Sequence, residues 1–300
     1  MNKKYIFVQM AEQTTHKFIR TDSLIDEAFD TLRTKDFKLV LQVGTDGILV
    51  TVNEKAHNKY IAFERYSFQH IYRFDDVCAL MEDLIKQSGL LKYAYHTVDC
   101  LIVNSLSTLV PSAVFEEERK KTYLKFNTFL EGDEFILADH LKTLDARNVF
   151  ALPFCLKGKL DFAFSNIRYH HFSSVLIEAL FAQHKNQGSQ KVMVHVQPSH
   201  FQVVVLDGKQ LLFYNMFNHH STEDFIYYLM FVCEQLHLNP EKIDLRLFGE
   251  IEKNSAIHLI TQKYIRNVTF EERNDQADYS YQLQALPKHS YFTLFNSSFL

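Results

Sequence analysis

The sequence predicts an α/β protein in which one folding unit, β-β-β-α-β, occurs twice. Two observations support this prediction. An apolar strand, a three-residue turn and a second apolar strand are found at residues 39–52 and again at residues 192–206. Equivalent hairpin positions such as Gln42 and His195 are 153 residues apart, and each copy continues into a third strand, a helix and a further strand. A recurring pattern of this kind indicates an internal duplication.

The first copy contains a hairpin, a third strand, a helix and a fourth strand. Its turn is Thr45-Asp46-Gly47, and an Asp-Gly pair adopts positive φ angles at low steric cost, which favours a hairpin with the next strand at residues 48–52. A third strand is predicted at residues 59–66. Apolar residues then recur every three or four positions between residues 74 and 85, which predicts a helix with one buried face. A strand at residues 95–103 follows.

The second copy repeats this order. Strands are predicted at residues 192–197, 201–206, 211–217 and 243–248. The helical spacing covers residues 225–236, and Ser221 or Thr222 is the predicted N-cap because a hydroxyl there accepts a hydrogen bond from a free backbone N–H.

Several other elements complete the prediction. They are a helix at residues 113–126 behind Pro111, a helix at residues 175–184 capped by Ser173 or Ser174, a helix ending at Ile265 and capped by Asn254 or Ser255, and a tail strand at residues 291–295. Since no low-complexity linker separates the halves, we expect residues 1–155 and 156–300 to form two subdomains around a shared cleft. The C-terminal tail is able to return to the first subdomain.

Composition and charge exclude several classes of function. The chain is 47 % hydrophobic and 23 % charged, which is typical of a globular protein. Its net charge of −4 makes it a poor partner for nucleic acid or an anionic membrane surface. No run approaches the ~20 apolar residues of a membrane span, and the apolar segment at residues 5–8 is too short for a signal peptide. We therefore expect a cytoplasmic protein with no nucleic-acid partner and no direct membrane insertion.

The cysteines are expected to be reduced. Cys78, Cys100, Cys155 and Cys233 are widely spaced and form no CxxC motif, as is usual for buried thiols of a cytosolic protein. Cys78 and Cys233 also fall on the apolar stripes of the two equivalent helices, so we expect both in the core.

Histidines and acid pairs raise two further hypotheses. Fifteen histidines suggest a metal site, and the candidates are His170, His171, His195, His200, His219 and His220. A zinc site needs three or four ligands in tetrahedral geometry, and neither HExxH nor a Cys/His spacing occurs, so we expect no metal. The pairs Asp75-Asp76 and Glu223-Asp224 open predicted helices, where the helix dipole favours negative charge. We interpret them as helix caps, not as catalytic acids.

Six short strings carry a resemblance to a known family. They are TLVP (108–111), SVLIEAL (174–180), FYN (213–215), EDFIYY (223–228), LFGE (247–250) and KYIRN (263–267). Through them most of the chain resembles an uncharacterised bacterial family, a domain of unknown function, assigned to the actin-like ATPase fold. In that fold two ribonuclease-H-like subdomains enclose a nucleotide cleft, and the duplicated β-β-β-α-β order is similar to its core. The pilus-assembly protein PilM and the division protein FtsA are distant relatives by fold.

The resemblance implies a first phosphate-binding loop that this chain carries in altered form. Active members have Asp-x-Gly there, and the matching residues read Gln42-Val43-Gly44, followed by Thr45 and Asp46. Gly44 would let the backbone approach a phosphate. Gln42 is a neutral amide and cannot replace a carboxylate near Mg²⁺, which prefers charged oxygen ligands.

The two remaining motifs that the resemblance implies are altered as well. The second phosphate loop reads His195-Val196-Gln197, without its acid or its glycine. The adenosine motif, normally an apolar strand ending in Gly-Gly, ends in Gly249-Glu250, and the carboxylate of Glu250 would repel phosphates. We therefore expect a degenerate nucleotide cleft formed by residues of these three motifs.

The resulting expectation is a non-catalytic, actin-like scaffold that binds a protein partner and needs no cofactor. An unusually high content of 27 Phe and 15 Tyr agrees with it, because exposed aromatic side chains are common at protein interfaces. The alternative is a divergent ATPase or sugar-kinase-like phosphotransferase that holds ATP and Mg²⁺ in the cleft, with Asp46 and Asp207 as the nearest spare carboxylates. Gln42 and His195 disfavour a third option, a metal-dependent nuclease.

Overall fold

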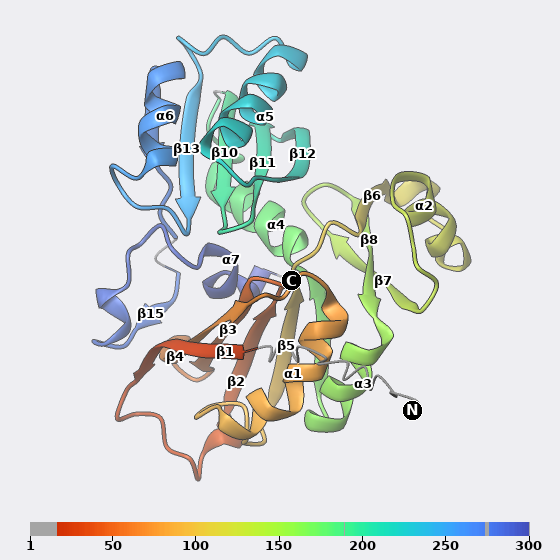
Figure 1. Cartoon of the computed structure of the whole chain (residues 1–300), viewed down its shortest axis with the longest axis vertical. Helices are drawn as coiled ribbons and strands as arrows, with labels where there is room; N and C mark the ends of the chain where they lie inside the picture. Colours follow the sequence, from red (N-terminus) through yellow and green to blue (C-terminus); the bar gives the residue numbers. More distant parts are fainter. Residues whose placement is uncertain (1–16, 189, 274–275, 300) are drawn as a thin grey trace, which may run out of the picture.

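The computed structural model describes residues 17–188, 190–273 and 276–299, so the N-terminal segment considered above as a signal peptide lies outside the described residues. Two β-sheets with helices on their outer faces lie one above the other, and a smaller sheet lies beside them (Figure 1). Among the described helices, none combines the length and the apolar character needed to cross a bilayer.

The first sheet has the strand order β1-β4-β3-β2-β5-β9, with β15 paired to β4. Its strands are β1 (Lys17–Ile25), β2 (Phe37–Val43), β3 (Gly47–Glu54), β4 (Lys59–Gln69), β5 (Thr97–Ile102), β9 (Ile167–His171) and β15 (Asp278–Tyr279). Two helices, α1 (Phe74–Gln87) and α3 (Phe154–Ala163), cover its outer face and bury Met81 and Leu156 against Leu39 and Leu41 of β2. Because β9 pairs with β5, this sheet extends past residue 155.

The second sheet has the order β12-β11-β10-β13-β14. Its strands are β10 (Gln190–Val196), β11 (His200–Asp207), β12 (Gln210–Asn218), β13 (Asp244–Gly249) and β14 (Asn267–Phe270), and its outer face is covered by α5 (Thr222–Gln235) and α6 (Ala256–Tyr264). Gln42 pairs with Leu49 and Leu101 in the first sheet, and His195 pairs with Gln202 and Phe248 in the second. The two patterns of antiparallel and parallel pairing are the same, so the predicted duplication is confirmed.

The third sheet was not predicted. It contains β6 (Ser107–Pro111), β7 (Glu134–Leu141) and β8 (Ala146–Pro153), and it packs against α2 (Lys120–Asn127) through Leu124, Val149 and Ala151. The predicted helix at residues 113–126 is therefore wrong in extent, because Pro111 ends a strand and two short 3₁₀ turns, Ser112–Val114 and Glu117–Arg119, precede α2. This insertion has no counterpart among the described residues of the second copy, so the duplication could not be used to predict its strands.

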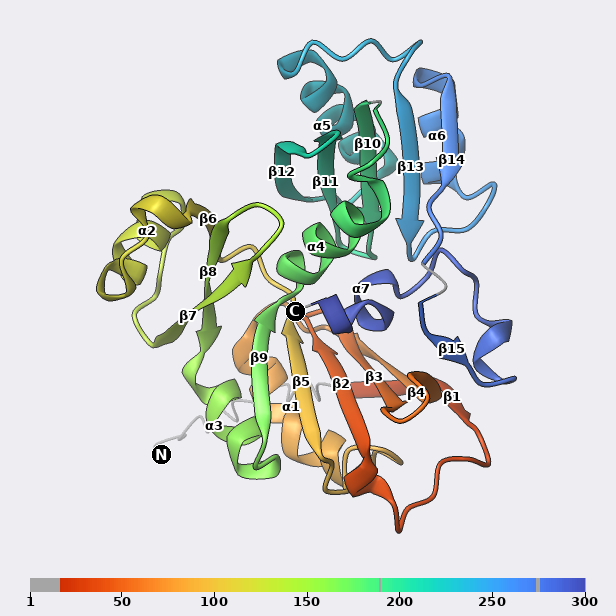
Figure 2. The ribbon, with the colours of Figure 1, turned by 180° about the vertical axis from the view of Figure 1, so that it is seen from behind.

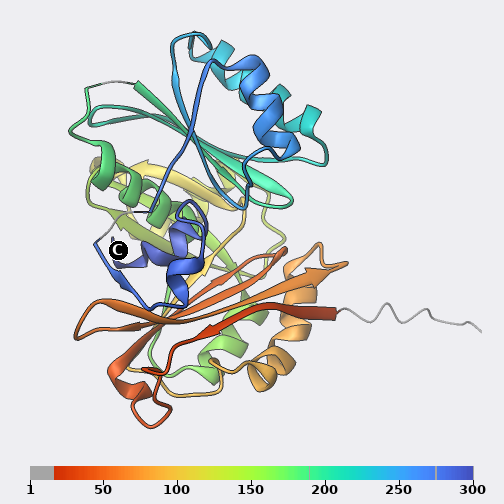
Figure 3. The ribbon, with the colours of Figure 1, turned by 90° about the vertical axis from the view of Figure 1, so that its left-hand side faces the viewer.

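Two helices fill the layer between the large sheets (Figures 2 and 3). α4 (Phe172–His184) is largely apolar and is buried from Phe172 to Phe181, and α7 (Phe292–Phe295) packs beside it in the same cluster of buried side chains. The predicted tail strand at residues 291–295 is wrong. Tyr291 has a left-handed φ of 56°, which turns the chain into α7, and the ring of Phe292 packs 4.9 Å from that of Phe248.

The helix starts largely follow the prediction. Ser221 caps α5 in a reciprocal arrangement with Asp224, Ser255 caps α6, and Asp75 lies in the first turn of α1. Asp224 is thus a helix-capping group, and Asp75 and Asp76 lie in the first turn of α1, where the helix dipole favours negative charge. The predicted cap of α4 is wrong, because the ring of His171 accepts the hydrogen bond from the Ser173 N–H and both candidate serines lie inside the first turn.

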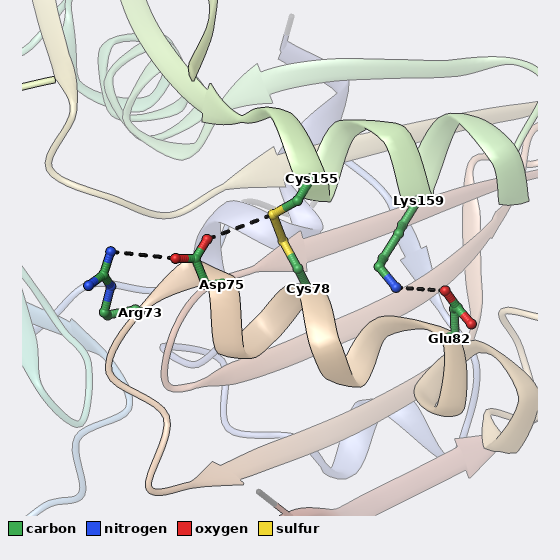
Figure 4. Close-up of a disulfide and its surroundings, with 6 residues drawn as sticks. All are labelled: Arg73, Asp75, Cys78, Glu82, Cys155 and Lys159. Carbon is green, nitrogen blue, oxygen red and sulfur yellow. Dashed lines mark hydrogen bonds and ion pairs between the residues drawn. A yellow bond between two sulfur atoms is a disulfide. The ribbon is translucent and has the colours of Figure 1, made fainter. Parts of the chain in front are cut away.

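The expectation of reduced cysteines is wrong for one pair. Cys78 of α1 and Cys155 at the start of α3 form a disulfide, with their Cα atoms 6.1 Å apart (Figure 4). The two residues are 77 positions apart, and only the packing of α1 on α3 brings them together. Cys78 is buried, as expected, whereas Cys155 is exposed. Cys100 and Cys233 are free and buried, and burial raises the pKa of the Cys233 thiol to about 11.

Candidate functional site

The two equivalent hairpin turns face each other between the large sheets. The turn between β2 and β3 carries Asp46, whose Oδ2 accepts hydrogen bonds from the Ser199 hydroxyl at 2.7 Å and the Ser199 N–H at 3.3 Å. Asp46 and Ser199 are 153 positions apart, the same offset that relates Gln42 to His195. Equivalent residues of the duplicated unit therefore contact each other, as they do near the axis of an isologous interface.

The charge on Asp46 is stabilised across this contact. His200 Nδ1 lies 3.4 Å from Asp46 Oδ2. Burial alone would raise the pKa of Asp46, but the hydrogen bond and charge of His200, together with the hydrogen bonds from Ser199, bring the pKa below its ordinary value. Asp46 is therefore a carboxylate held by the opposite subdomain.

A second polar contact joins the sheets next to the first. The guanidinium of Arg65 on β4 forms an ion pair with Glu250, which follows β13, and Arg65 also donates to the Tyr291 hydroxyl at 3.4 Å. Burial raises the pKa of Glu250; Arg65 opposes this rise and the nearby Asp46 adds to it. Burial would lower the pKa of Arg65, but the charge of Glu250 and the contact with Tyr291 together outweigh it, so the pKa of Arg65 is raised. The pair therefore favours a charged guanidinium, while burial and the nearby Asp46 oppose the charge on Glu250.

Gln42, Gly44 and Thr45 form the first candidate loop. The side chain of Gln42 is buried, and its Oε1 accepts a hydrogen bond from the Thr293 hydroxyl of α7 at 2.7 Å. Gly44 donates its N–H to the Gly47 carbonyl at 3.1 Å, and a Cβ at position 44 would lie 3.3 Å from Val103 Cβ. Thr45 is half-buried in the same turn. The loop is thus packed on β5 and on the C-terminal helix.

His195 and Gln197 form the second candidate loop with Gln202. His195 Nδ1 lies 2.8 Å from Gln202 Oε1, and Gln197 Nε2 lies 3.3 Å from His195 Nε2. Burial lowers the pKa of His195 to about 4, so the imidazole is neutral at pH 7. A carbonyl acceptor at Nδ1 and an amide donor at Nε2 fit the tautomer with its proton on Nδ1. This network replaces the metal-associated acid by a buried neutral ring.

Gly249 is retained for packing at the end of β13. Its φ is 95°, and a Cβ there would lie 2.3 Å from the Val196 carbonyl oxygen and 3.0 Å from His195 Cδ2. The Gly249 N–H donates to the His289 carbonyl at 2.8 Å, and the Glu250 N–H donates to the Val196 carbonyl at 2.8 Å. The close approach of two backbone segments therefore accounts for this glycine.

The predicted site residues converge only in part. Five of them line one cavity of about 30 Å³ between the sheets: Gln42, Gly44, Asp46, Gln197 and Glu250. That space suits one or two water molecules. The other three, Thr45, His195 and Gly249, do not line it. The sequence reasoning missed Arg65, although a charged residue inside the apolar strand at residues 59–66 was a signal that could have found it.

A larger and more open pocket lies on the other side of Glu250. Its volume is about 670 Å³, and it is bordered by Ser199, His219, Glu252 and the first residues of α5 and α6. Pockets of roughly 300–1,000 Å³ accommodate small-molecule ligands. The carboxylates of Glu250 and Glu252 make this one unfavourable for phosphate groups.

The candidate histidines do not form a metal site. His170 Nδ1 contacts Asp139 at 2.9 Å, His171 caps α4, and His195 contacts Gln202. Within the described ranges, no group of three or more His, Cys, Asp or Glu side chains is arranged to hold a metal ion.

Comparison with known proteins places this geometry in a family. No curated protein matches the sequence significantly. The structure is similar to that of a Bacteroides thetaiotaomicron protein with actin-like ATPase fold and unknown function (24% identity, 85% of this chain and 97% of the other, TM-score 0.73). It is also similar to a chain of the PilM–PilN type IV pilus biogenesis complex (11% identity, 81% of this chain and 90% of the other, TM-score 0.52).

These structural similarities identify the fold as the actin-like ATPase fold, in agreement with the duplicated sheets. The family model described as "Protein of unknown function (DUF3822)" matches residues 26–268. The chain therefore belongs to this family, which the resemblance of its sequence strings had indicated.

Proposed function

We propose that the protein is a non-catalytic, protein-binding module of actin-like fold that acts as a scaffold and does not hydrolyse ATP. The observation that carries this proposal is the hydrogen bond between Asp46 and Ser199. It joins the two turns that would hold the phosphates in an active member of the fold.

The chemistry of the motif positions supports the same proposal. Gln42 is a buried amide bonded to Thr293, and His195 is a neutral imidazole bonded to Gln202. Neither group supplies the negative charge that holds hydrated Mg²⁺. The cavity of about 30 Å³ beside Asp46 is also far smaller than a nucleoside triphosphate requires.

A protein partner is favoured by the exposed aromatic side chains. Phe162 and Phe126 are exposed by 96% and 90%. Aromatic side chains in contact with water are typical anchors of protein interfaces. The PilM–PilN complex offers a fold analogy, because a chain similar in structure to this one is part of a type IV pilus biogenesis complex. We further propose a cytoplasmic location, and the net charge of −4 supports the proposal that the protein has no nucleic-acid partner.

A second candidate is a divergent phosphotransferase or a protein that binds a nucleoside. The pocket of about 670 Å³ beside α5 and α6 is large enough for a nucleoside, although the bordering Glu250 and Glu252 disfavour phosphate groups. For a phosphotransferase the candidate acid would be Asp46, beside the first candidate loop.

Calorimetric titration of the full chain with ATP and Mg²⁺, together with a phosphate-release assay, tests both candidates. We expect no release of phosphate from the wild-type chain. Turnover that is lost in Asp46→Ala and kept in Asp207→Ala would overturn the proposal. Asp207 is the matched control because it is an exposed acid at the hairpin between β11 and β12. Binding of adenosine without turnover would support a nucleoside ligand in the larger pocket and leave the absence of catalysis intact.

A further inference from the structure

A groove on the outer face of the first sheet lies far from the candidate cleft. Its volume is about 650 Å³, and its walls are the C-terminal half of α1, residues 91–94 and the end of α3. α1 and α3 lie side by side on the outer side of the sheet (Figure 1). The groove is thus a surface feature that the proposed nucleotide chemistry does not use.

The base of the groove is apolar. It is formed by Ile85, Leu91 and the ring of Tyr93, while Gly158 on α3 leaves open space where a side chain would stand. Phe162, at the end of α3, is 96% exposed at the rim. Burial of this exposed phenyl ring by a partner would remove apolar surface from water and so stabilise the complex.

The rim of the groove is basic although the chain as a whole is acidic. Lys86, Lys92 and Lys159 line it with a single acid, Glu82, which forms an ion pair with Lys159 at 2.6 Å. Lys86 and Lys92 are exposed, and Lys92 Nζ lies 5.3 Å from the centre of the Tyr93 ring. Against a net charge of −4, this local excess of positive charge would attract acidic side chains.

The two walls are fixed relative to each other. The disulfide between Cys78 and Cys155 links α1 to α3 near their N-terminal ends, and the Lys159–Glu82 ion pair links them again beside the groove (Figure 4). A groove whose walls are already held in place loses less conformational entropy when a ligand binds.

The second copy has a groove at the matching place, between α5 and α6, with a different charge. It has a volume of about 810 Å³ and is lined by Tyr227, Phe231, Glu223, Glu234 and Lys263, among others. Two acids and one lysine line this groove, against three lysines and one acid in the first. The duplication therefore provides an internal comparison between two grooves of comparable volume whose charged lining residues have opposite net sign.

We propose that the groove between α1 and α3 binds a short peptide segment of a partner protein in which an apolar anchor residue is flanked by Asp or Glu. The apolar base receives the anchor and covers Phe162, and Lys86 and Lys92 pair with the flanking acids. This inference rests on the proposed protein-binding function and adds the location and the chemistry of the partner.

Selection of a random peptide display library on the full, disulfide-bonded chain tests the inference. We expect enriched peptides to combine an apolar or aromatic residue with neighbouring acids. Their affinity, measured by fluorescence polarisation on synthetic copies, should fall about tenfold or more in Lys86→Glu/Lys92→Glu and in Phe162→Ala, and should weaken with added salt. All three substituted side chains are exposed, so the variants should fold.

The matched control is the Tyr227→Ala/Lys263→Glu variant of the second groove, which should bind the peptides as the wild type does. Reduction of the disulfide should weaken binding without abolishing it. The inference is overturned if no peptide is enriched, if the enriched peptides lack acids, or if their affinity changes only in the control variant. In the last case the proposed protein-binding function would still be supported, but its site would be the second groove. ATP turnover in the separate assay would overturn the proposed function and would not test the groove.

Discussion

The Asp46 carboxylate accepts a hydrogen bond of 2.7 Å from the hydroxyl of Ser199, its own counterpart in the duplicated unit. The two turns occupy equivalent places in the duplicated unit, but one carries an acid and the other a hydroxyl. The two side chains can therefore form a hydrogen bond with each other. The contact connects the subdomains at the point where the fold would otherwise present two loops to a ligand. It also makes the stability of the chain depend on the charge of one side chain.

Asp46→Asn should lower the free energy of unfolding by about 1–2 kcal/mol at neutral pH, because the hydrogen bonds to a charged acceptor become hydrogen bonds to a neutral one. The pKa of Asp46 is below its ordinary value of 3.8 in the folded chain. The contribution of Asp46 to the free energy of unfolding is therefore present above pH 3.8, and it is lost as the pH falls through the pKa of Asp46 in the folded chain. Denaturant unfolding at neutral pH and at about pH 3 checks both statements.

The exposed acid Asp207 is the control for this prediction. Asp207→Asn should change the stability by less than about 0.5 kcal/mol at either pH. An equal effect of the two substitutions would mean that the contact with Ser199 does not stabilise the closed arrangement.

The buried His195 should make the protein less stable in mild acid. Burial lowers its pKa from 6.5 to about 4, so between these values the unfolded chain binds a proton that the folded chain does not. The free energy of unfolding should fall as the pH decreases from 6.5 to 4, by up to about 3 kcal/mol from this residue. In His195→Gln, unfolding curves measured across this range should show a smaller slope with pH, whatever the absolute stability. An unchanged slope would contradict the prediction.

The sequence predicted the two large sheets well and the insertion poorly, for a physical reason. The strands and helices of the duplicated unit carry strong apolar periodicity, and each copy supports the assignment of the other. β7 and β8 have no such counterpart. The segment at residues 291–295 is a short apolar run, in which strand and helix cannot be distinguished by periodicity, and its contact with Phe248 decides the outcome.

The contacts of the candidate site could not be predicted from the sequence. Gln42 and Glu250, at two motif positions, and Asp46, a spare carboxylate beside the first motif, line one cavity. Their partners Ser199, Arg65 and Thr293 come from segments far apart in the sequence. A single sequence contains no information on such pairs, because only the packing of one sheet against the other selects them.

The disulfide predicts a definite thiol count. In denaturant without reductant, a thiol reagent should detect two thiols per chain, those of Cys100 and Cys233, and after reduction it should detect all four cysteines. Reduction should also lower the melting temperature, because a cross-link over 77 residues restricts the unfolded chain and contributes at most about 4.5 kcal/mol.

Cys155→Ser supplies the control for the effect of reductant. Its melting temperature should equal that of the reduced wild type and should not respond to reductant. Alkylation of all four cysteines in protein trapped with the reagent at the moment of cell lysis would show that the disulfide is absent in the cell and would contradict this prediction.

Substitution of Gly249 tests whether this motif glycine is needed for ligand binding or for the packing of the backbone. A Cβ at this position would lie 2.3 Å from the Val196 carbonyl, and the backbone φ of 95° is strained for any other residue. Gly249→Ala should therefore destabilise the chain by roughly 3 kcal/mol or more. Gly208→Ala is the matched control, because Gly208 also has a positive φ, 56°, but no atom lies within 4 Å of the added carbon. This substitution should lower the free energy of unfolding by only about 1 kcal/mol. If the glycine were kept to admit a phosphate, Gly249→Ala would instead match Gly208→Ala in stability and differ from it only in nucleotide binding.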